Sequence, residues 1–317
     1  MAKRKFIIDC DAGVDDAFAL ILALNQPDVD VLAVTCVGGN TELNDVCINV
    51  MKVLEVCKRT DVPVFKGAST SLIGVTTKRA SHFHGKDGLG DATGIPDPDM
   101  SRLKEEHAVN AILRLTRQHP GEITLVALAP LTNIALACRL DPMLPQNLKN
   151  VVIMGGNCEA KGNDDRVCAE FNFHTDVEAA SVCLNELTCP VAIVTWETCL
   201  QHCLSWEFYD ELTSLGTNKS NFFKKITKTS SEFYRQKKEG YGTFYTCCDL
   251  FAMAVAVSPD IVEEETHVHA TVELSGKHTR GQMVVDWRGS LKKQPNLMLV
   301  RRCNIEKYKV LALNSLK

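Results

Sequence analysis

The chain has 317 residues, of which 45% are hydrophobic and 23% are charged, and its formal net charge is −4. This length fits one large α/β domain or two ordinary ones, and the composition is typical of a soluble globular protein with a substantial core. The charge gives no basic surface, which argues against nucleic acid or an anionic membrane as a partner, and no apolar run approaches the roughly 20 residues of a membrane span.

The fourteen cysteines are scattered through the chain and form no Cys-x-x-Cys pair, which argues against a zinc ribbon or a thioredoxin-type motif. Near the N-terminus the apolar run Phe6-Ile7-Ile8 is too short for a signal peptide. Free thiols persist in a reducing compartment, so we expect a cytoplasmic protein.

Short apolar runs alternate with helical stretches along the first two hundred residues. The predicted strands are Lys5–Ile8, Val31–Val37, Val62–Phe65, Ile123–Ala127, Val151–Met154 and Val191–Val194. The predicted helices are Ala17–Leu24, Leu43–Lys58, Ala108–Gln118, Thr132–Arg139 and Val177–Glu186. Because the strands are continuous apolar runs, they favour a mostly parallel sheet that is covered by helices on both faces. The sequence therefore predicts a doubly wound, Rossmann-like α/β fold.

Other segments depart from this alternation. Residues 67–104 and 155–171 are long and rich in polar residues and glycine, which is typical of functional loops. Residues 205–239 are predicted to be helical, and residues 265–303 alternate like antiparallel strands. Since no linker-like segment divides the chain, we expect a single domain over residues 1–317.

Four aspartates, Asp9, Asp11, Asp15 and Asp16, follow the first predicted strand within eight positions. Ligands of open α/β sheets bind beyond the carboxyl ends of the strands, where this acidic loop lies. The dipole of the following helix accounts for one or two carboxylates in its first turn, but not for four. Crowded carboxylates lose their ionised forms unless a cation compensates, and hard divalent ions prefer oxygen ligands. The pattern therefore predicts a metal site.

Two classes of enzyme place Asp-x-Asp after a first strand. In haloacid-dehalogenase-like phosphatases the first of these, here Asp9, would be the nucleophile, but Gly13 stands where they usually carry Thr or Val. The stretch Asp9–Asp16 also resembles the opening motif Asp-x-Asp-x-Gly-x-Asp-Asp of the inosine–uridine nucleoside N-ribohydrolase family. Ala12, where the family commonly has Pro, is the one departure.

Further blocks resemble this family in order along most of the chain. They are Val37-Gly38-Gly39-Asn40, His84-Gly85-Lys86-Asp87-Gly88-Leu89-Gly90, Leu131-Thr132-Asn133-Ile134-Ala135, Met154-Gly155-Gly156-Asn157, Ala169-Glu170-Phe171-Asn172, Cys248-Asp249, Thr279-Arg280-Gly281 and Val284-Val285-Asp286. Each block alone has an ordinary explanation, such as a strand-ending turn or a helix cap. The ordered set is what identifies the resemblance.

The resemblance implies a ribonucleoside as substrate and Ca²⁺ as cofactor, with the ion held by Asp11, Asp16, Asp249 and the carbonyl of Leu128. Asp11 would be the general base and Asp9 would orient the loop. The implied contacts to the substrate are Asp15, Asn40, Glu170 and Asn172 at the ribose hydroxyls, Met154 and Asn163 close to the sugar, and His84 beside the pocket. Family resemblance also suggests a homodimer or homotetramer.

Cys248 departs from the usual family pattern, because it replaces the histidine often proposed as the acid for the leaving base. A subset of the family shares this cysteine. A thiol near carboxylates stays neutral at pH 7. We therefore expect Cys248 to contribute modestly to catalysis, with aromatic stacking, Tyr241 or Tyr245 assisting. A phosphatase that uses Asp9 and a catalytically weak nucleoside-binding protein remain alternatives, and the preferred base stays open.

Overall fold

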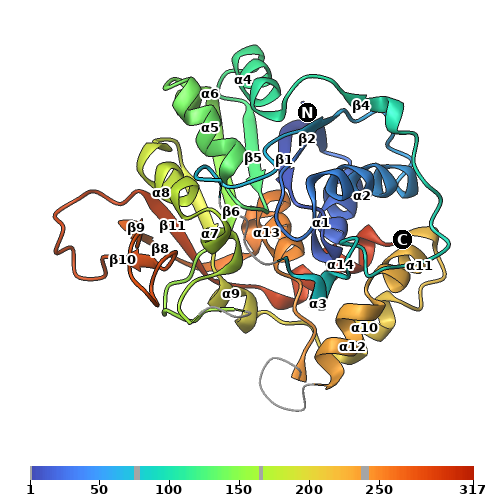
Figure 1. Cartoon of the computed structure of the whole chain (residues 1–317). Helices are drawn as coiled ribbons and strands as arrows, with labels where there is room; N and C mark the ends of the chain where they lie inside the picture. Colours follow the sequence, from blue (N-terminus) through green and yellow to red (C-terminus); the bar gives the residue numbers. More distant parts are fainter. Residues whose placement is uncertain (1, 75–78, 164–166, 237–242) are drawn as a thin grey trace.

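The structure, a computed structural model, describes residues 2–74, 79–163, 167–236 and 243–317 (Figure 1). A nine-stranded sheet with the order β4-β3-β2-β1-β5-β6-β7-β11-β8 forms the centre of this part of the chain. Its strands are β1 (Arg4–Cys10), β2 (Val29–Cys36), β3 (Val64–Lys66), β4 (Leu103–Lys104), β5 (Ile123–Ala127), β6 (Leu148–Met154), β7 (Val191–Val194), β8 (Val262–Val268) and β11 (Leu297–Cys303). Neighbouring strands are parallel except β8, which runs antiparallel to β11. The predicted mostly parallel sheet is thereby confirmed.

Helices cover both faces of the sheet and bury a separate apolar layer on each (Figure 1). One layer contains α1 (Val14–Leu24), α2 (Leu43–Val56), α13 (Cys248–Val257) and α14 (Ile305–Ser315). The other contains α4 (Ala108–Gln118), α5 (Thr132–Leu140), α6 (Leu144–Asn147) and α8 (Val177–Glu186). Strand β5 is buried along its whole length, as a strand between two helical layers must be.

The predicted helical stretch 205–239 divides into three helices in its described part: α10 (Trp206–Leu212), α11 (Asn218–Ile226) and α12 (Lys228–Gln236). The side chains of Ser205 and Thr217 cap α10 and α11 by accepting backbone N–H bonds, so a new helix begins after Thr217 rather than α10 continuing. Helix α12 packs against the short helix α3 (Ser81–His84), with the rings of Phe83 and Tyr234 centred 5.1 Å apart. This contact brings the polar loop 67–104 to the helical stretch.

The remaining elements are short and lie around the edge of the sheet. Strands β9 (Ala270–Val272) and β10 (Met283–Val285) form an antiparallel hairpin, as the alternation predicted. The others are α7 (Phe171–Thr175), α9 (Trp196–Gln201) and the 3₁₀ turns Met100–Arg102 and Pro259–Ile261. None of the helices in the described residues is long and apolar enough to cross a membrane.

The order in which the chain adds strands to the sheet reverses at β1. From β1 the order runs outward through β2 on one side and through β5 on the other. Such a reversal leaves a crevice at the carboxyl ends of the two strands, which is where α/β proteins bind ligands. The acidic loop follows β1, and Leu128 comes directly after β5.

Candidate active site

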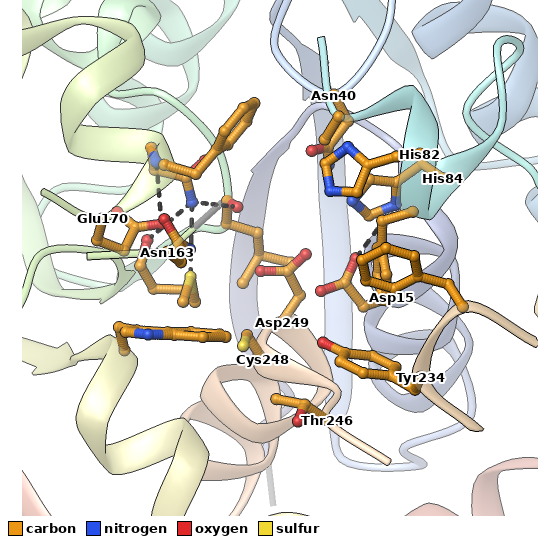
Figure 2. Close-up of a pocket in the computed structure, with 18 of the residues that line it drawn as sticks. Asp15, Asn40, His82, His84, Asn163, Glu170, Tyr234, Thr246, Cys248 and Asp249 are labelled. Atoms are coloured by element: carbon orange, nitrogen blue, oxygen red, sulfur yellow. Dashed lines mark hydrogen bonds and ion pairs between the residues drawn. The ribbon is translucent and has the colours of Figure 1, made fainter. Parts of the chain in front are cut away.

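A cavity of about 530 Å³ opens at these carboxyl ends. Ten of the residues singled out from the sequence line it: Asp15, Asn40, His84, Leu128, Met154, Asn163, Glu170, Asn172, Cys248 and Asp249. Glu170 and Asn163 lie on one side, Asp15, Asn40 and His84 lie on the other, and Asp249 and Cys248 lie between them (Figure 2). The structure therefore brings together residues that are distant in the sequence.

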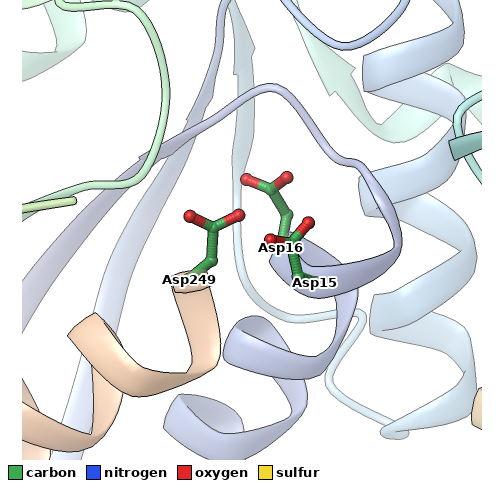
Figure 3. A group of neighbouring side chains, drawn as sticks. All are labelled: Asp15, Asp16 and Asp249. Carbon is green, nitrogen blue, oxygen red and sulfur yellow. The ribbon is translucent and has the colours of Figure 1, made fainter. Parts of the chain in front are cut away.

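Three carboxylates converge at the base of this cavity. Asp15 and Asp16 stand in the first turn of α1, and Asp249 stands in the first turn of α13, which packs beside α1. One oxygen from each lies within 4.8 Å of the others (Figure 3). Oδ1 of Asp15 and Oδ1 of Asp16 are buried without a hydrogen-bond partner.

Burial and the neighbouring acids raise the pKa of Asp16 to about 7 and the pKa of Asp249 well above its ordinary value. Buried carboxylates with unpartnered oxygens are hard donors, and they fit a divalent cation that would compensate their charge. Asp15, which was predicted as a substrate contact, lies in this group as close as the predicted ligands Asp16 and Asp249.

Asp11 is fully buried and is not among the residues that line the cavity. Its carboxylate accepts hydrogen bonds from the backbone N–H of Asn40 at 2.7 Å and from Nδ2 of Asn40 at 3.0 Å. The same Nδ2 lies 3.3 Å from Oδ2 of Asp16, so Asn40 links the two acids. Burial, followed by the charge of Asp16, raises the pKa of Asp11 well above its ordinary value.

The side chain of Asp9 is hydrogen-bonded inside the fold and does not face the cavity. Its Oδ1 accepts hydrogen bonds from the Thr35 hydroxyl at 2.6 Å and from Nδ2 of Asn133 at 2.8 Å, and the side chain is fully buried. Asp9 is not among the residues that line the cavity. A nucleophile must reach its substrate, so this placement argues against the phosphatase alternative and agrees with a role in orienting the loop.

One wall of the cavity combines His84 with aromatic side chains. Nδ1 of His84 accepts the backbone N–H of Val14 at 3.1 Å and lies 3.8 Å from Oδ1 of Asp15. Burial lowers the pKa of His84 to about 4, so the ring is neutral at pH 7 and carries its proton on Nε2. The sequence reasoning missed most of this wall and its surroundings, which include His82, Phe83, Phe233, Tyr234 and Thr246.

One of the two tyrosines expected near the nucleobase lies elsewhere. Tyr245 is fully buried among Tyr209, Trp206 and Phe223 and does not line the cavity, which corrects the expectation that it assists the leaving base. Tyr241, the other tyrosine named, lies outside the described residues. Tyr234 is the described tyrosine that lines the cavity, which Trp196 also lines.

The opposite wall is built by Glu170 and Asn172. The Glu170 carboxylate accepts the backbone N–H groups of Asn172, Phe173 and Gly156 at 2.9, 3.1 and 3.0 Å, so it caps α7 and ties that helix to the end of β6. Burial raises its pKa to about 7. Nδ2 of Asn172 donates to the carbonyl of Leu128 at 3.0 Å, which fixes that carbonyl at the cavity.

Cys248 lies at the start of α13 and is 8% exposed. The adjacent Cys199 thiol, together with burial, holds the pKa of Cys248 well above its ordinary value, so the side chain is a neutral thiol at pH 7. All fourteen cysteines of the chain are free thiols.

Comparison with known proteins agrees with this site. Residues 6–310 match the family model of the inosine-uridine preferring nucleoside hydrolases. An inosine-uridine preferring nucleoside hydrolase of Leishmania major is 34% identical over 316 residues, which cover 99% of this chain and 98% of that protein. A pyrimidine-specific ribonucleoside hydrolase, RihA, of Salmonella arizonae is 31% identical over 292 residues, which cover 92% and 91% of the two chains.

A solved structure of an inosine-guanosine nucleoside hydrolase superposes with a TM-score of 0.91 at 36% sequence identity, covering 99% of this chain and 98% of that one. These relatives differ in the bases that their names record, but each is named as a nucleoside or ribonucleoside hydrolase. The chain therefore belongs to the inosine-uridine preferring nucleoside hydrolase family.

Proposed function

We propose that the protein hydrolyses the N-glycosidic bond of ribonucleosides to ribose and free base, and that the reaction depends on Ca²⁺. The observation that carries this proposal is the convergence of buried carboxylates at the floor of a cavity between two polar walls. Family membership supports the reaction, and the unpartnered oxygens of Asp15 and Asp16 support the ion.

The ligands that we propose for calcium are Asp11, Asp16, Asp249 and the Leu128 carbonyl. The oxygen of Asp15 beside Asp16 and Asp249 makes Asp15 a further candidate ligand. When bound, a divalent ion of this kind lowers the pKa of water and orients hydroxyl groups, which is the chemistry that the hydrolysis needs.

Asp11 is the proposed general base, which takes a proton from the attacking water. The two hydrogen bonds from Asn40 orient its carboxylate. The sugar would lie between Asp15 and Asn40 on one wall and Glu170 and Asn172 on the other, with its hydroxyls paired by these groups. Carboxylates around the ring favour the positive charge that develops on the sugar as the bond breaks, so they act mainly in the transition state.

The nucleobase of the substrate would lie beside Trp196, Phe83 and Tyr234. Burial raises the pKa of Tyr234 well above its ordinary value, so its hydroxyl is protonated and is a hydrogen-bond donor for the departing base. Cys248 is a weaker donor because an S–H group forms weaker hydrogen bonds than an O–H group does. We therefore assign the main assistance to Tyr234 and the ring stacking, and a modest part to Cys248.

Acidic side chains dominate the charge of the cavity. Asp15, Glu170 and Asp249 line it, and its lining in the described residues contains no Lys or Arg. Nucleoside 5′-phosphates should therefore bind poorly, because nothing in the described lining compensates their charge. The free thiols are consistent with the proposed cytoplasmic location, and a homodimer or homotetramer is the proposed assembly.

The test is chromatographic detection of free base, together with a reducing-sugar assay, after incubation of a panel of ribonucleosides with the protein and calcium. The proposal predicts ribose and base in equal amounts, and loss of most turnover in Asp11→Ala with its fold retained. Binding of nucleosides without any product would instead identify the catalytically weak binding protein. Release of phosphate from nucleotides, with nucleosides left intact, would support a phosphatase.

A further inference from the structure

A buried carboxylate outside the cavity lining organises residues 158–163, which follow β6. Glu197, in the first turn of α9, is 2% exposed. Resting on the proposed function, we infer that Glu197 is a positioning residue: it holds the segment 158–163 in place and thereby sets Asn163 against the sugar.

The carboxylate of Glu197 binds three backbone N–H groups of this segment. Oε2 accepts the N–H of Cys158 at 2.9 Å, and Oε1 accepts those of Glu159 at 2.9 Å and Lys161 at 3.2 Å. A run of N–H groups that curves around one anion stabilises a buried charge without a cation. The fold of this segment therefore depends on the charge of Glu197.

The backbone of the segment is strained in a way that needs such an anchor. Ala160 has a φ of +57°, in the left-handed region that residues other than glycine adopt at a cost. The three N–H bonds to Glu197 lie on both sides of Ala160 and close the curve around the carboxylate. Without them, residue 160 would be expected to relax toward an ordinary conformation.

The segment leads directly to the cavity. Gly162 and Asn163 line it, and Oδ1 of Asn163 is buried without a hydrogen-bond partner, on the same side as Glu170 (Figure 2). The backbone N–H of Asn163 donates to the carbonyl of Ala169 at 3.3 Å. The free oxygen suits a hydroxyl of the substrate, and its position follows from the backbone that Glu197 holds.

Asn157, directly before this segment, also binds it. Its Nδ2 donates to the carbonyl of Lys161 at 3.0 Å and to that of Cys168 at 2.6 Å, and its Oδ1 accepts the N–H of Met283 at 3.1 Å. Glu197 directly follows Trp196, which lines the cavity, so the same helix α9 both places this indole and binds the segment.

The test is a double-mutant cycle of Glu197→Gln and Asn163→Ala, read as separate KM and kcat values for ribose release at saturating calcium. Glutamine keeps one acceptor oxygen and turns an amide N–H₂ toward the loop donors, so at least one donor loses its partner. Since Asn163 is placed to bind the sugar in both ground and transition states, we expect KM to rise about tenfold or more, with kcat changed less than threefold. In the Asn163→Ala background the same change should raise KM less than twofold.

Glu159→Gln is the matched control. It lies in the same segment, but its carboxylate pairs with Lys161 at the surface, so its KM should equal that of the wild type. Glu197→Asp keeps the charge and withdraws it by one methylene, so its KM should lie between those of the wild type and Glu197→Gln. It replaces Glu197→Gln in the cycle if that variant does not fold.

The proposal is wrong if the change at Glu197 leaves KM unaltered, lowers kcat alone, or raises KM by the same factor with and without Asn163. A wild-type protein that releases no ribose would refute the proposed function itself, and that measurement precedes the cycle.

Discussion

Gly39→Ala tests the placement of Asp11 by a steric change alone. A Cβ atom at position 39 would lie 2.0 Å from Oδ2 of Asp11 and 2.8 Å from its carboxyl carbon. Real Cβ atoms essentially never approach a neighbour closer than 3.0 Å, so the carboxylate or the loop must move by at least 3.0 minus 2.0, or 1 Å. Asn40 follows in the chain and binds the same oxygen, so both residues would be displaced.

A displacement of this size at a catalytic group typically costs about 100-fold in rate, which is close to 3 kcal/mol of transition-state stabilisation. We therefore expect kcat/KM of Gly39→Ala to fall about 100-fold, measured by ribose release at low ribonucleoside concentration and saturating calcium. Circular dichroism would show that the fold persists.

Gly121→Ala is the comparison variant, because a Cβ at that position meets nothing within 4 Å. Its φ of +73° costs some stability, but the turn lies ahead of β5 and far along the strand from the cavity, so kcat/KM should be unchanged. If Gly39→Ala retained more than a third of the wild-type value, the position of Asp11 could not matter as we argue.

Three further predictions follow from the burial of single side chains and from the polar walls. The pKa of His84 is about 4 in the folded protein against an ordinary 6.5, so its contribution to the free energy of unfolding is complete above pH 6.5 and is lost as the pH falls toward 4. At 1.36 kcal/mol per pH unit this loss is about 3 kcal/mol. In His84→Gln the free energy of unfolding, measured with urea, should therefore fall less steeply between pH 6.5 and pH 4. An equally steep fall in the variant would contradict this. Tyr245→Phe removes a buried hydroxyl that has no partner and should leave turnover and thermal midpoint nearly unchanged, whereas Tyr234→Phe and, more weakly, Cys248→Ala should slow natural nucleosides and spare an artificial one with a good leaving group. A hundredfold loss of kcat in Cys248→Ala on natural substrates alone would show that the thiol is the main acid. Ribonucleosides should be cleaved at least tenfold faster than 2′-deoxyribonucleosides, because a missing hydroxyl leaves a buried partner unpaired at ~1–3 kcal/mol, and equal rates on inosine and deoxyinosine would refute the placement of the sugar between the two walls.

The sheet and the residues that directly follow its strands could be predicted from the sequence. Ile123–Ala127 and Val191–Val194 have the predicted bounds, because a strand buried on both faces is a continuous apolar run. The residues after β1 and β5 meet at one edge for the same reason, which is why the acidic loop and Leu128 lie together.

Contacts between distant helices could not be predicted in the same way. The packing of α3 on α12 creates the wall of Phe83 and Tyr234, and no local pattern records which helices meet. Tyr245, in contrast, was expected at the cavity but does not reach it. Its backbone pairs with Leu204, and its ring packs against Tyr209 instead. Composition around a tyrosine does not fix that direction.

The acidic group was predicted in part. The crowding of the four aspartates predicted a metal site, and the family resemblance then assigned Asp16 to the ion and Asp15 to a ribose hydroxyl. In the structure both reach the start of α13, because they stand in the first turn and Asp249 faces that turn. Glu170 is both a helix cap and a wall of the cavity, two roles that the sequence presents as alternatives.

Calcium titration of chelator-treated protein tests the central claim most directly. Bound calcium per chain and the rate of ribose release would be measured on the same samples as calcium is added. We predict that chelated protein is inactive and that the rate rises in proportion to bound calcium until one ion is held per chain, with Asp249→Asn binding weakly and turning over slowly. Full turnover in protein that holds no metal, or saturation of calcium without any change in rate, would contradict the account.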